Sequence, residues 1–434
     1  MPTLVYRITE VLSAIVIDLP LGTNLGLFHI LWTLLSGRLL QSRGALIPAV
    51  AATGLEPAAV RRAWAAFAAG AWDVSQLLAA LQALVRQEGR WHAQHCGGYR
   101  VVAVDTTGFY RPRLKDCATK HYLSQAGEAL PAIPFGLIAS IGQVGLQTVP
   151  LVRHIVRAPS ATATEAELVS AVLAQAAAQL ACDEAIVVDR GFTLGKLCAA
   201  KVPRWVSRVP RNFTARRVAL PEYGGKGRRP SRGSLVRPLA RTRKGHTLAA
   251  TPPDRTETLL VAGRSVQADI WNELCLPQAE PASSAFQCVV FRDPAYSDPW
   301  VLATNLALPA VALLAFYHER WPVEQVPLTA KQLIGAQRQF VSADAARQRL
   351  PELALFASSL LMYLAATHPA QSTGFWDRTP RPTAGRFRRV LAQLDISKTA
   401  PLPRQLRKKA SVTSHLPKGI LAHRRSARPI QARL

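Results

Sequence analysis

Paired cysteines, acidic residues and targeting signals are scarce in this sequence. The six cysteines stand at positions 96, 117, 182, 198, 275 and 288 without a CxxC pair or a Cys/His ligand spacing. A zinc site is therefore not expected, and the thiols fit a reducing cytosol. The amino terminus carries Glu10 and Asp18 and has no charged segment ahead of an apolar core, which argues against a signal peptide. The glycine-rich segment GGKGRRP lacks the Gly-Lys-Ser/Thr ending of a P-loop.

Long uninterrupted apolar runs are also missing. The charge-free run 129–152 has the length of a membrane span, but prolines and the turn Gly142–Gly145 break it. Two buried strands joined by a turn fit this pattern better. The apolar stretch 350–366 is short and flanked by polar residues, so we expect a helix that packs on the core. No contact with a membrane is expected.

The positive charge is concentrated rather than spread. Hydrophobic residues make up 49% of the 434 residues and charged residues 18%, as in a folded protein of two to four structural units. Residues 204–244 and 378–434 each contain a single acid among many Lys and Arg, and together they account for the whole net charge of +26. Such segments indicate a polyanion partner, first nucleic acid and second an anionic membrane, against the simpler interpretation of a solvated basic face.

The first 98 residues are rich in Ala and Leu with helical periodicity. Within them, residues 44–68 read as a short helix, a Thr53-Gly54 turn and a second helix opened by Pro57. In a DNA-reading helix-turn-helix, Arg61 and Arg62 would face DNA. An ordinary helical hairpin is an equally common structure for this pattern.

Two apolar runs each end in an aspartate. YRVVAVD ends at Asp105 and AIVVD ends at Asp189. Between them lie the two strands expected in 130–152 and a helix over 161–181, for which Thr164 is a suitable cap. Aspartates at the ends of central strands can gather a metal ion, although Asp also ends many strands as a turn former. Two matching strand ends favour the first interpretation.

After Asp189 we expect a helix, a strand and then a change of pattern. Residues 209–299 are rich in Arg, Gly and Pro with short β-like runs, as in an inserted strand-rich lobe. Its basic residues suit contacts with DNA phosphates, and the candidates are Arg211, Arg228, Arg229 and Lys244. WVLATNL then returns to a strand.

The segment YHERWPVEQVPLTAK follows that strand. On one α-helix, Tyr317, Arg320, Glu324 and Lys331 would project within an arc of roughly 60°, which sets a carboxylate among three groups suited to phosphate. A surface helix with ordinary Arg to Glu pairing has the same spacing. Pro322 and Pro327 lie within or beside this helix, and an interior proline kinks or breaks a helix. The four residues would share one face only if the helix stayed straight.

The intervals Tyr, two residues, Arg, three residues, Glu, six residues, Lys are those of the YREK motif. The chain resembles the DDE transposases of bacterial insertion sequences, in the IS-four superfamily with its Tn-five-like relatives. The resemblance includes VAVDTT and VVDRGF and extends over residues 99–345. The helical start and the basic tail resemble the branch grouped as IS-seven-oh-one. Leu328 departs from relatives that carry a basic residue at that position.

This resemblance implies a mixed α/β chain with an RNase H-like core in two parts, 99–208 and 300–345, split by the lobe 209–299. Residues 1–98 would bind the DNA end, and 346–434 would serve DNA binding or dimerisation. Asp105, Asp189 and Glu324 would hold two Mg²⁺ ions, for which Mn²⁺ can substitute, while Tyr317, Arg320 and Lys331 would contact DNA. Relatives also flip a base onto an aromatic side chain, for which Trp271 and Trp205 are candidates, although most tryptophans are core residues.

The resulting hypothesis is a transposase of the bacterial cytoplasm, associated with the nucleoid. It would bind the terminal inverted repeats of an insertion sequence as a homodimer and catalyse strand cleavage and strand transfer into target DNA. Two alternatives stay open: an RNase H-like DNA nuclease, and a catalytically silent, domesticated DNA-binding protein. A phosphatase with an aspartate nucleophile is disfavoured, because Thr107 stands where its second aspartate would be.

Overall fold

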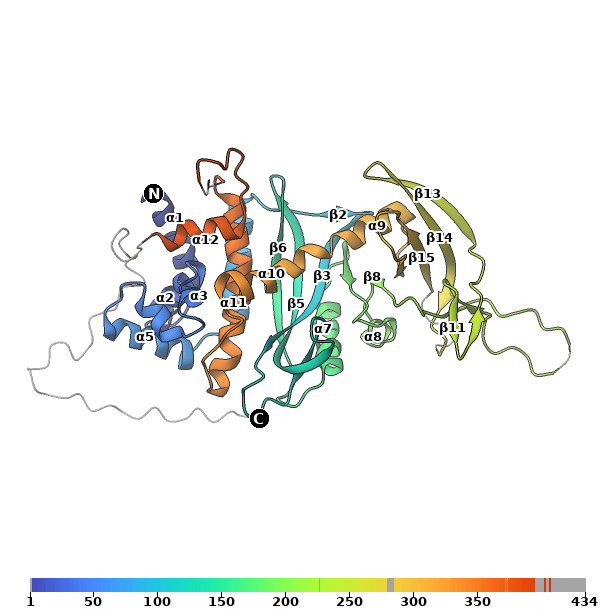
Figure 1. Ribbon diagram of the computed structural model, residues 1–434, viewed down its shortest axis with the longest axis horizontal. Coiled ribbons are helices and arrows are strands. Elements are labelled where there is room, and N and C mark those ends of the chain that lie inside the picture. The colour runs from blue at the N-terminus through green and yellow to red at the C-terminus, as the bar shows by residue number, and fades with distance from the viewer. Residues whose placement is uncertain are drawn as a thin grey trace, which may run out of the picture.

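The computed structural model describes residues 2–225, 227–278, 285–370, 372, 374–394, 402 and 406. It is a mixed α/β protein built on one large mixed sheet. The molecule is elongated, with helices at one end, the centre of the sheet in the middle and a strand-rich lobe at the other end (Figure 1). Most of the basic segment 378–434 lies outside the described residues, so the DNA-binding and dimerisation roles expected of it are not addressed by the structure.

The amino-terminal part is helical, as its periodicity predicts. Pro57 opens one helix in its first turn, where a missing N–H costs nothing, and Asp73 forms a capping box with Gln76 at the start of the next. Within residues 44–68 the two expected helices and their turn are present. The helices are α1 (Pro2–Val16), α2 (Thr23–Leu35), α3 (Arg38–Gln41), α4 (Leu46–Ala51), α5 (Pro57–Ala69) and α6 (Val74–Glu88).

Five strands form the middle of the sheet, in the order β6-β5-β3-β7-β8. The first three are antiparallel neighbours, whereas β7 runs parallel to both β3 and β8. The run 129–152 accounts for most of β5 and β6, which confirms the interpretation as two buried strands. The bounds are β3 (Tyr99–Tyr110), β5 (Glu128–Val144), β6 (Gln147–Arg157), β7 (Glu184–Val188) and β8 (Trp205–Arg208). Short strands β1 (His92–Ala93), β2 (His95–Cys96) and β4 (Lys120–Leu123) pair at their edges.

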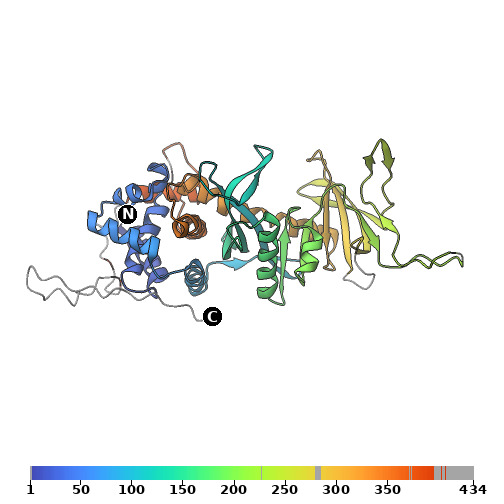
Figure 2. The same cartoon turned by 90° about the horizontal axis from the view of Figure 1, so that it is seen from below.

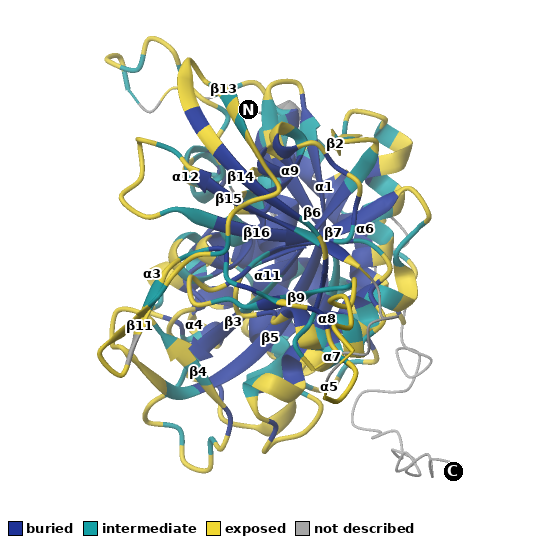
Figure 3. Cartoon of the chain, turned by 90° about the vertical axis from the view of Figure 1, so that its right-hand side faces the viewer, coloured by how far each residue is buried: buried dark blue, intermediate teal, exposed yellow. Residues whose placement is uncertain are grey.

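Helices cover both faces of these strands. On one face, α7 (Glu165–Gln179) packs on β5 beside α8 (Leu194–Ala199), and Thr164 caps α7 through a capping box with Glu167, as predicted. On the other face, α11 (Asp344–Thr367) and α6 pack on β6, and α11 also contacts α2 and α5, so it lies between the sheet and these two helices (Figure 2). Seen along the long axis, the strands form a buried centre surrounded by exposed loops (Figure 3).

The helix α11 has a composition that a membrane span would also have. It is the one described helix that is long and apolar enough to cross a bilayer, and α5 and α6, which are bent relative to each other, would be long enough only if they formed one span together. In α11, 89% of the apolar stretch is buried inside the protein. Burial against the sheet explains this apolarity, in agreement with the expected core-packing helix.

The strand-rich lobe extends the same sheet rather than forming a separate one. From β8 the order continues through β16, β15, β14, β9 and β10, with β13 paired to β14. A separate hairpin of β11 and β12 stands beside it. The strands are β9 (Ala215–Arg217), β10 (Leu235–Val236), β11 (Arg241–Arg243), β12 (His246–Leu248), β13 (Arg255–Val261), β14 (Arg264–Cys275), β15 (Phe286–Arg292) and β16 (Trp300–Thr304).

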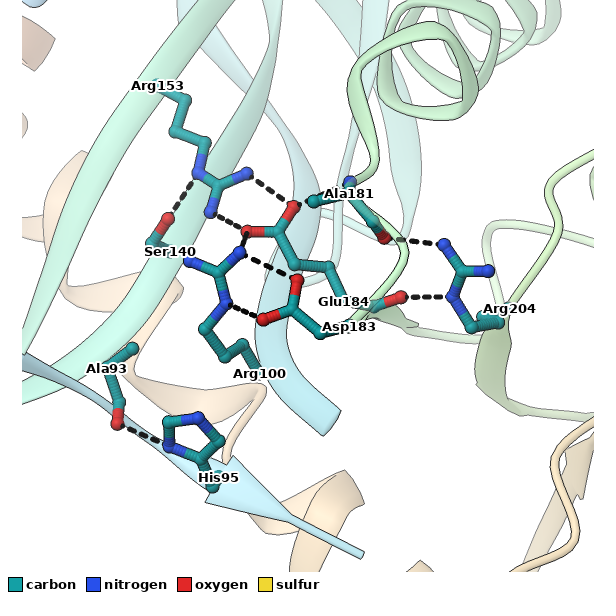
Figure 4. A network of polar contacts seen from close by, with 9 residues as sticks. All are labelled: Ala93, His95, Arg100, Ser140, Arg153, Ala181, Asp183, Glu184 and Arg204. Carbon is teal, nitrogen blue, oxygen red and sulfur yellow. Dashed lines mark hydrogen bonds and ion pairs between the residues drawn. The ribbon is translucent and has the colours of Figure 1, made fainter. Parts of the chain in front are cut away.

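A buried acid anchors the amino-terminal end of β7. The Glu184 carboxylate is 2% exposed and receives hydrogen bonds from the guanidinium of Arg153 and from the Ala181 N–H, and Arg100 approaches it at 3.2 Å (Figure 4). Burial alone would raise the pKa of Glu184, but these hydrogen bonds keep it below its ordinary value. The network fixes β7 against its neighbours at the end opposite Asp189.

Candidate active site

Two aspartates lie where the pairing of β3 with β7 ends. Asp189 directly follows β7, but Asp105 lies inside β3, which continues to Tyr110 in its pairing with β5, so the prediction that Asp105 ends its strand is wrong. The β3 and β7 ladder ends with Ala103 paired to Val187, so each aspartate lies two residues beyond this pair, and the charge of Asp189 reaches Asp105 and raises its pKa. Alternation along a strand also sends both side chains to one face. Ala103 and Val187 belong to the same core cluster, on the face that α11 covers.

The segment after β16 does not form the single helix that its spacing suggests. It consists of α9 (Ala310–His318), a 3₁₀ turn (Trp321–Glu324), α10 (Gln325–Leu328) and a π-helical turn (Thr329–Ile334). The prediction that the four motif residues share one face of a regular helix is therefore wrong. Pro322 and Pro327 supply the physical reason, because a proline has no N–H to donate and its ring clashes with the preceding turn. The hydrogen-bonding pattern changes from 3₁₀ to α to π along the segment, although the residues that join these turns all keep right-handed helical backbone angles.

This broken helix nevertheless brings the third carboxylate to the aspartates. The 3₁₀ turn packs against β3, β5 and β6. Arg320 Nη2 donates to Glu324 Oε1 at 2.5 Å, and Tyr317 Oη donates to Asp189 Oδ1 at 3.4 Å. The Arg320 guanidinium also stacks over the Tyr317 ring at 5.8 Å. We call Asp105, Asp189 and Glu324 the acidic triad.

The charges of the triad act on one another. Burial raises the pKa of Asp105 to about 6, and the negative charges of Glu324 and Asp189 add to that rise, while Arg320 and a hydrogen bond from the Thr106 N–H oppose it. Burial disfavours the charged form of Arg320, yet the Tyr317 hydroxyl and all three carboxylates hold its pKa above the ordinary value. Arg320, 5% exposed, is thus the counter-cation of the triad.

The carboxylate oxygens of the triad are suitable ligands for a hard metal ion, but in this structure the carboxylates interact with the Arg320 guanidinium instead. Among the described residues, no three His, Cys, Asp or Glu side chains are close enough together to hold a metal ion as they stand. Glu324 is engaged by Arg320 instead. A divalent cation would stabilise carboxylates whose negative charges lie this close to one another.

Lys331 reaches the same face from the π-helical turn. Its Nζ donates to Thr107 Oγ1 at 2.8 Å and lies 5.4 Å from the centre of the Phe109 ring. Burial lowers the pKa of Lys331 to about 8, against the attraction of Asp105, which raises it. All four residues of the spacing motif therefore gather at the two aspartates, although they come from different helical turns.

The two tryptophans expected to stack on a flipped base are core residues. Trp205 is 2% exposed and Trp271 is 1% exposed, and both pack in the core cluster on the face that α7 covers. The Trp271 indole N–H donates to the carbonyls of Thr251 and Pro252. Neither ring offers a face to a base in this structure, in agreement with the interpretation of tryptophans as core residues: as large apolar side chains on a sheet covered by helices, they fill the interior.

The basic candidates for DNA contact are exposed and lie outside the triad. Arg61 and Arg62 project from α5. In the lobe, Arg211 pairs with Asp298 at 2.5 Å. The exposed lobe candidates also include Arg228, Arg229 and Lys244. Exposure makes these side chains accessible to DNA, and their role in binding it stays a prediction.

Three residues near the triad were not predicted from the sequence as site residues. Thr107 follows Asp105 by two positions, so strand alternation could have indicated that it shares the same face. Trp321 is 62% exposed beside Arg320, whose guanidinium lies 5.9 Å from its ring. Arg208 at the end of β8 stacks over Trp300 and lowers the pKa of Tyr317, opposing the burial that raises it. No sequence pattern marks Arg208, because strand pairing brings it there.

The fold and site define an α/β protein with an acidic triad, balanced by a buried arginine, at the point where the parallel pairing of β3 with β7 ends. The chain matches no protein-family model, and a search of curated proteins finds no match.

Proposed function

We propose that this chain is a DNA transposase of the DDE class, which binds terminal inverted repeats and catalyses strand cleavage and strand transfer. One observation carries the proposal. The register of β3 against β7 sets Asp105 beside Asp189, and the same face receives Tyr317, Arg320, Glu324 and Lys331. An ordinary surface helix with Arg to Glu pairing would have no reason to bury its arginine among three carboxylates.

The sheet topology supports an RNase H-like core. Three antiparallel strands, a crossover helix and two further parallel strands follow one another along the chain as β3, β5, β6, α7, β7 and β8. In space the order is β6-β5-β3-β7-β8, with β3 in the centre. This is the arrangement expected of such a core, in which the first acid stands on the central strand and the second on its parallel neighbour.

The acidic triad would hold two Mg²⁺ ions, with Mn²⁺ as a substitute. Carboxylate oxygens are the ligands that Mg²⁺ prefers, and it completes its shell with water and substrate phosphate, so three protein carboxylates suffice. When bound, such a pair of ions activates a water or a 3′-hydroxyl and stabilises the leaving oxygen at phosphorus. To take part, the Glu324 carboxylate would turn from Arg320.

The basic residues of the motif would bind the DNA backbone. A guanidinium released from Glu324 can contact a phosphate through two parallel N–H donors, and Lys331 can act as a point charge. Tyr317 would donate its hydroxyl to a phosphate oxygen. Exposed arginines on α5 and in the lobe would contribute contacts that are sensitive to salt, because each one neutralises a phosphate.

The test compares cleavage and joining of a labelled duplex that carries the terminal repeat, with Mg²⁺, by wild type and Glu324→Gln. Glutamine keeps the size of the side chain and removes the metal-binding charge. Glu319→Gln is the matched control, because Glu319 is a half-buried acid five residues earlier that bonds none of the triad. We expect wild type and the control to cut and join, and Glu324→Gln to bind the duplex without cutting.

Two other results would replace the proposal. Cleavage without preference for the repeat end, and without joining, would identify an RNase H-like nuclease. Binding without cleavage by wild type and Glu324→Gln alike, with Mg²⁺ and with Mn²⁺, would identify a catalytically silent DNA-binding protein.

A further inference from the structure

The Lys331 ammonium is held by a partner that carries no charge. Thr107 Oγ1 accepts its hydrogen bond at 2.8 Å, and the rings of Phe109 and Tyr110 lie 5.4 and 5.8 Å from Nζ. Among the ion pairs of the described residues, none includes Lys331. An ammonium has three N–H donors, so one bond to Thr107 leaves donors for another acceptor.

The position of Thr107 is determined by the strand that carries Asp105. It lies two residues further along β3, on the same face, and is 3% exposed. Its β-branched side chain restricts rotation about χ1, so the hydroxyl has few alternative positions. Thr107 therefore couples the direction of the ammonium to the strand that carries the first aspartate.

The lysine itself comes from an unusual piece of backbone. The π-helical turn Thr329–Ile334 ends in Gly335 at φ 95°, and a Cβ there would lie 2.4 Å from the Leu40 Cα. The Ala336 N–H closes the turn on the Ala330 carbonyl. Single π-turns occur frequently at functional sites, where they re-aim side chains. Here the wider turn presents Lys331 to Thr107 rather than continuing the direction of α10.

We propose that Thr107 is a positioning residue, which holds the Lys331 ammonium beside Asp105 so that its remaining donors meet the phosphodiester to be cut. This inference rests on the proposed transposase function and adds to it a residue outside the spacing motif. Thr107 is buried and accepts a hydrogen bond from the lysine, so its effect on cleavage should pass through Lys331. Such dependence can be measured.

The experiment is a double-mutant cycle on the full chain, with cleavage of the repeat-end duplex as the readout. Thr107→Val keeps the shape and removes the acceptor, Thr107→Ser keeps the acceptor, and Lys331→Met removes the ammonium. We expect Thr107→Val to lower kcat by about 10- to 100-fold with little change in KM, as for a misplaced group. Thr107→Ser should recover most of that loss.

The second arm of the cycle separates positioning from general damage. In the Lys331→Met background, Thr107→Val should cause no further loss. Thr258→Val is the matched control, because it makes the same chemical change at an exposed strand position in β13 that bonds none of the triad, and it should leave kcat within about threefold of wild type. Thermal unfolding of each variant verifies that the fold is intact.

An equal loss in both backgrounds would overturn the inference while leaving the proposed function standing. If wild type cleaves no duplex, the proposed function fails, and Thr107 is then judged by NMR of reductively ¹³C-methylated lysine. A Lys331 signal that is immobilised in wild type and Thr107→Ser but mobile in Thr107→Val would support the positioning role. A signal unchanged by Thr107→Val would refute it.

Discussion

Replacing Asp105 by asparagine should stabilise the protein at neutral pH. Burial raises the pKa of Asp105 from 3.8 to about 6, so the folded state binds this proton more tightly than the unfolded chain. The stability linked to it is fully present below the unfolded pKa and is lost as the pH rises through about 6. The asparagine side chain would carry no charge at this position, and its oxygen can still accept the Thr106 N–H.

The expected size follows from the shift. One pKa unit corresponds to about 1.4 kcal/mol, so a shift of roughly two units gives up to about 3 kcal/mol at pH 7.5. Partial access of solvent to the carboxylate makes this an upper value. Urea unfolding of wild type and Asp105→Asn between pH 4 and 7.5, in a chelator, measures the difference. The difference should shrink to about half a kcal/mol at pH 4 and disappear below the unfolded pKa of 3.8, and Mg²⁺ should narrow it if the triad holds metal in wild type.

Asp183→Asn is the control with the opposite sign. The exposed Asp183 carboxylate bonds Arg100 at 2.7 and 2.8 Å, and this hydrogen bonding lowers its pKa. Its replacement should lower stability at pH 7.5 and have no effect at low pH. The reasoning about Asp105 would be refuted if Asp105→Asn were less stable than wild type at pH 7.5, or if its gain persisted unchanged at pH 4.

Arg320→Met should lower the free energy of unfolding by about 3–5 kcal/mol, because it leaves the three carboxylates without their counter-cation. In thermal melts Mg²⁺ should restore part of this loss. A melting temperature equal to that of wild type would contradict the prediction. Glu184→Gln should cost a similar amount, about 3–5 kcal/mol, by breaking the network at the start of β7. Because its hydrogen bonds lower the pKa of Glu184, this contribution in wild type should be present above the ordinary glutamate pKa and lost as the pH falls through the lowered one, which acid titrations of stability would detect. Cys182 should react with a thiol reagent in the folded protein, whereas Cys288, whose pKa burial raises, should react only after unfolding; fast modification of Cys288 would show that its core opens.

Much of the local structure could be predicted from the sequence. The start of β3, the pair within 129–152, the cap at Thr164 and strand 185–188 all depend on patterns within a few residues: alternation, apolar runs and capping chemistry. The end of β3 did not follow from these patterns, because pairing with β5 carries the strand past Asp105 to Tyr110. The broken helix at Tyr317–Lys331 was predicted with the wrong geometry. The two prolines indicated an interruption, but which turn type replaces each lost hydrogen bond depends on packing against β3, β5 and β6.

The sequence by itself determined the kinds of element, the concentration of charge, and the spacing of Asp105, Asp189 and Glu324 with their basic companions. The tertiary structure decided which groups meet. Parallel pairing of β3 with β7 joins two aspartates that are distant along the chain, and packing of the helical turns adds Arg320 as their counter-cation. Burial of Trp205 and Trp271, and the Lys331 to Thr107 bond, were likewise decided there. The reason is that local propensity acts over a few residues, whereas strand register and core packing join residues by distance in space.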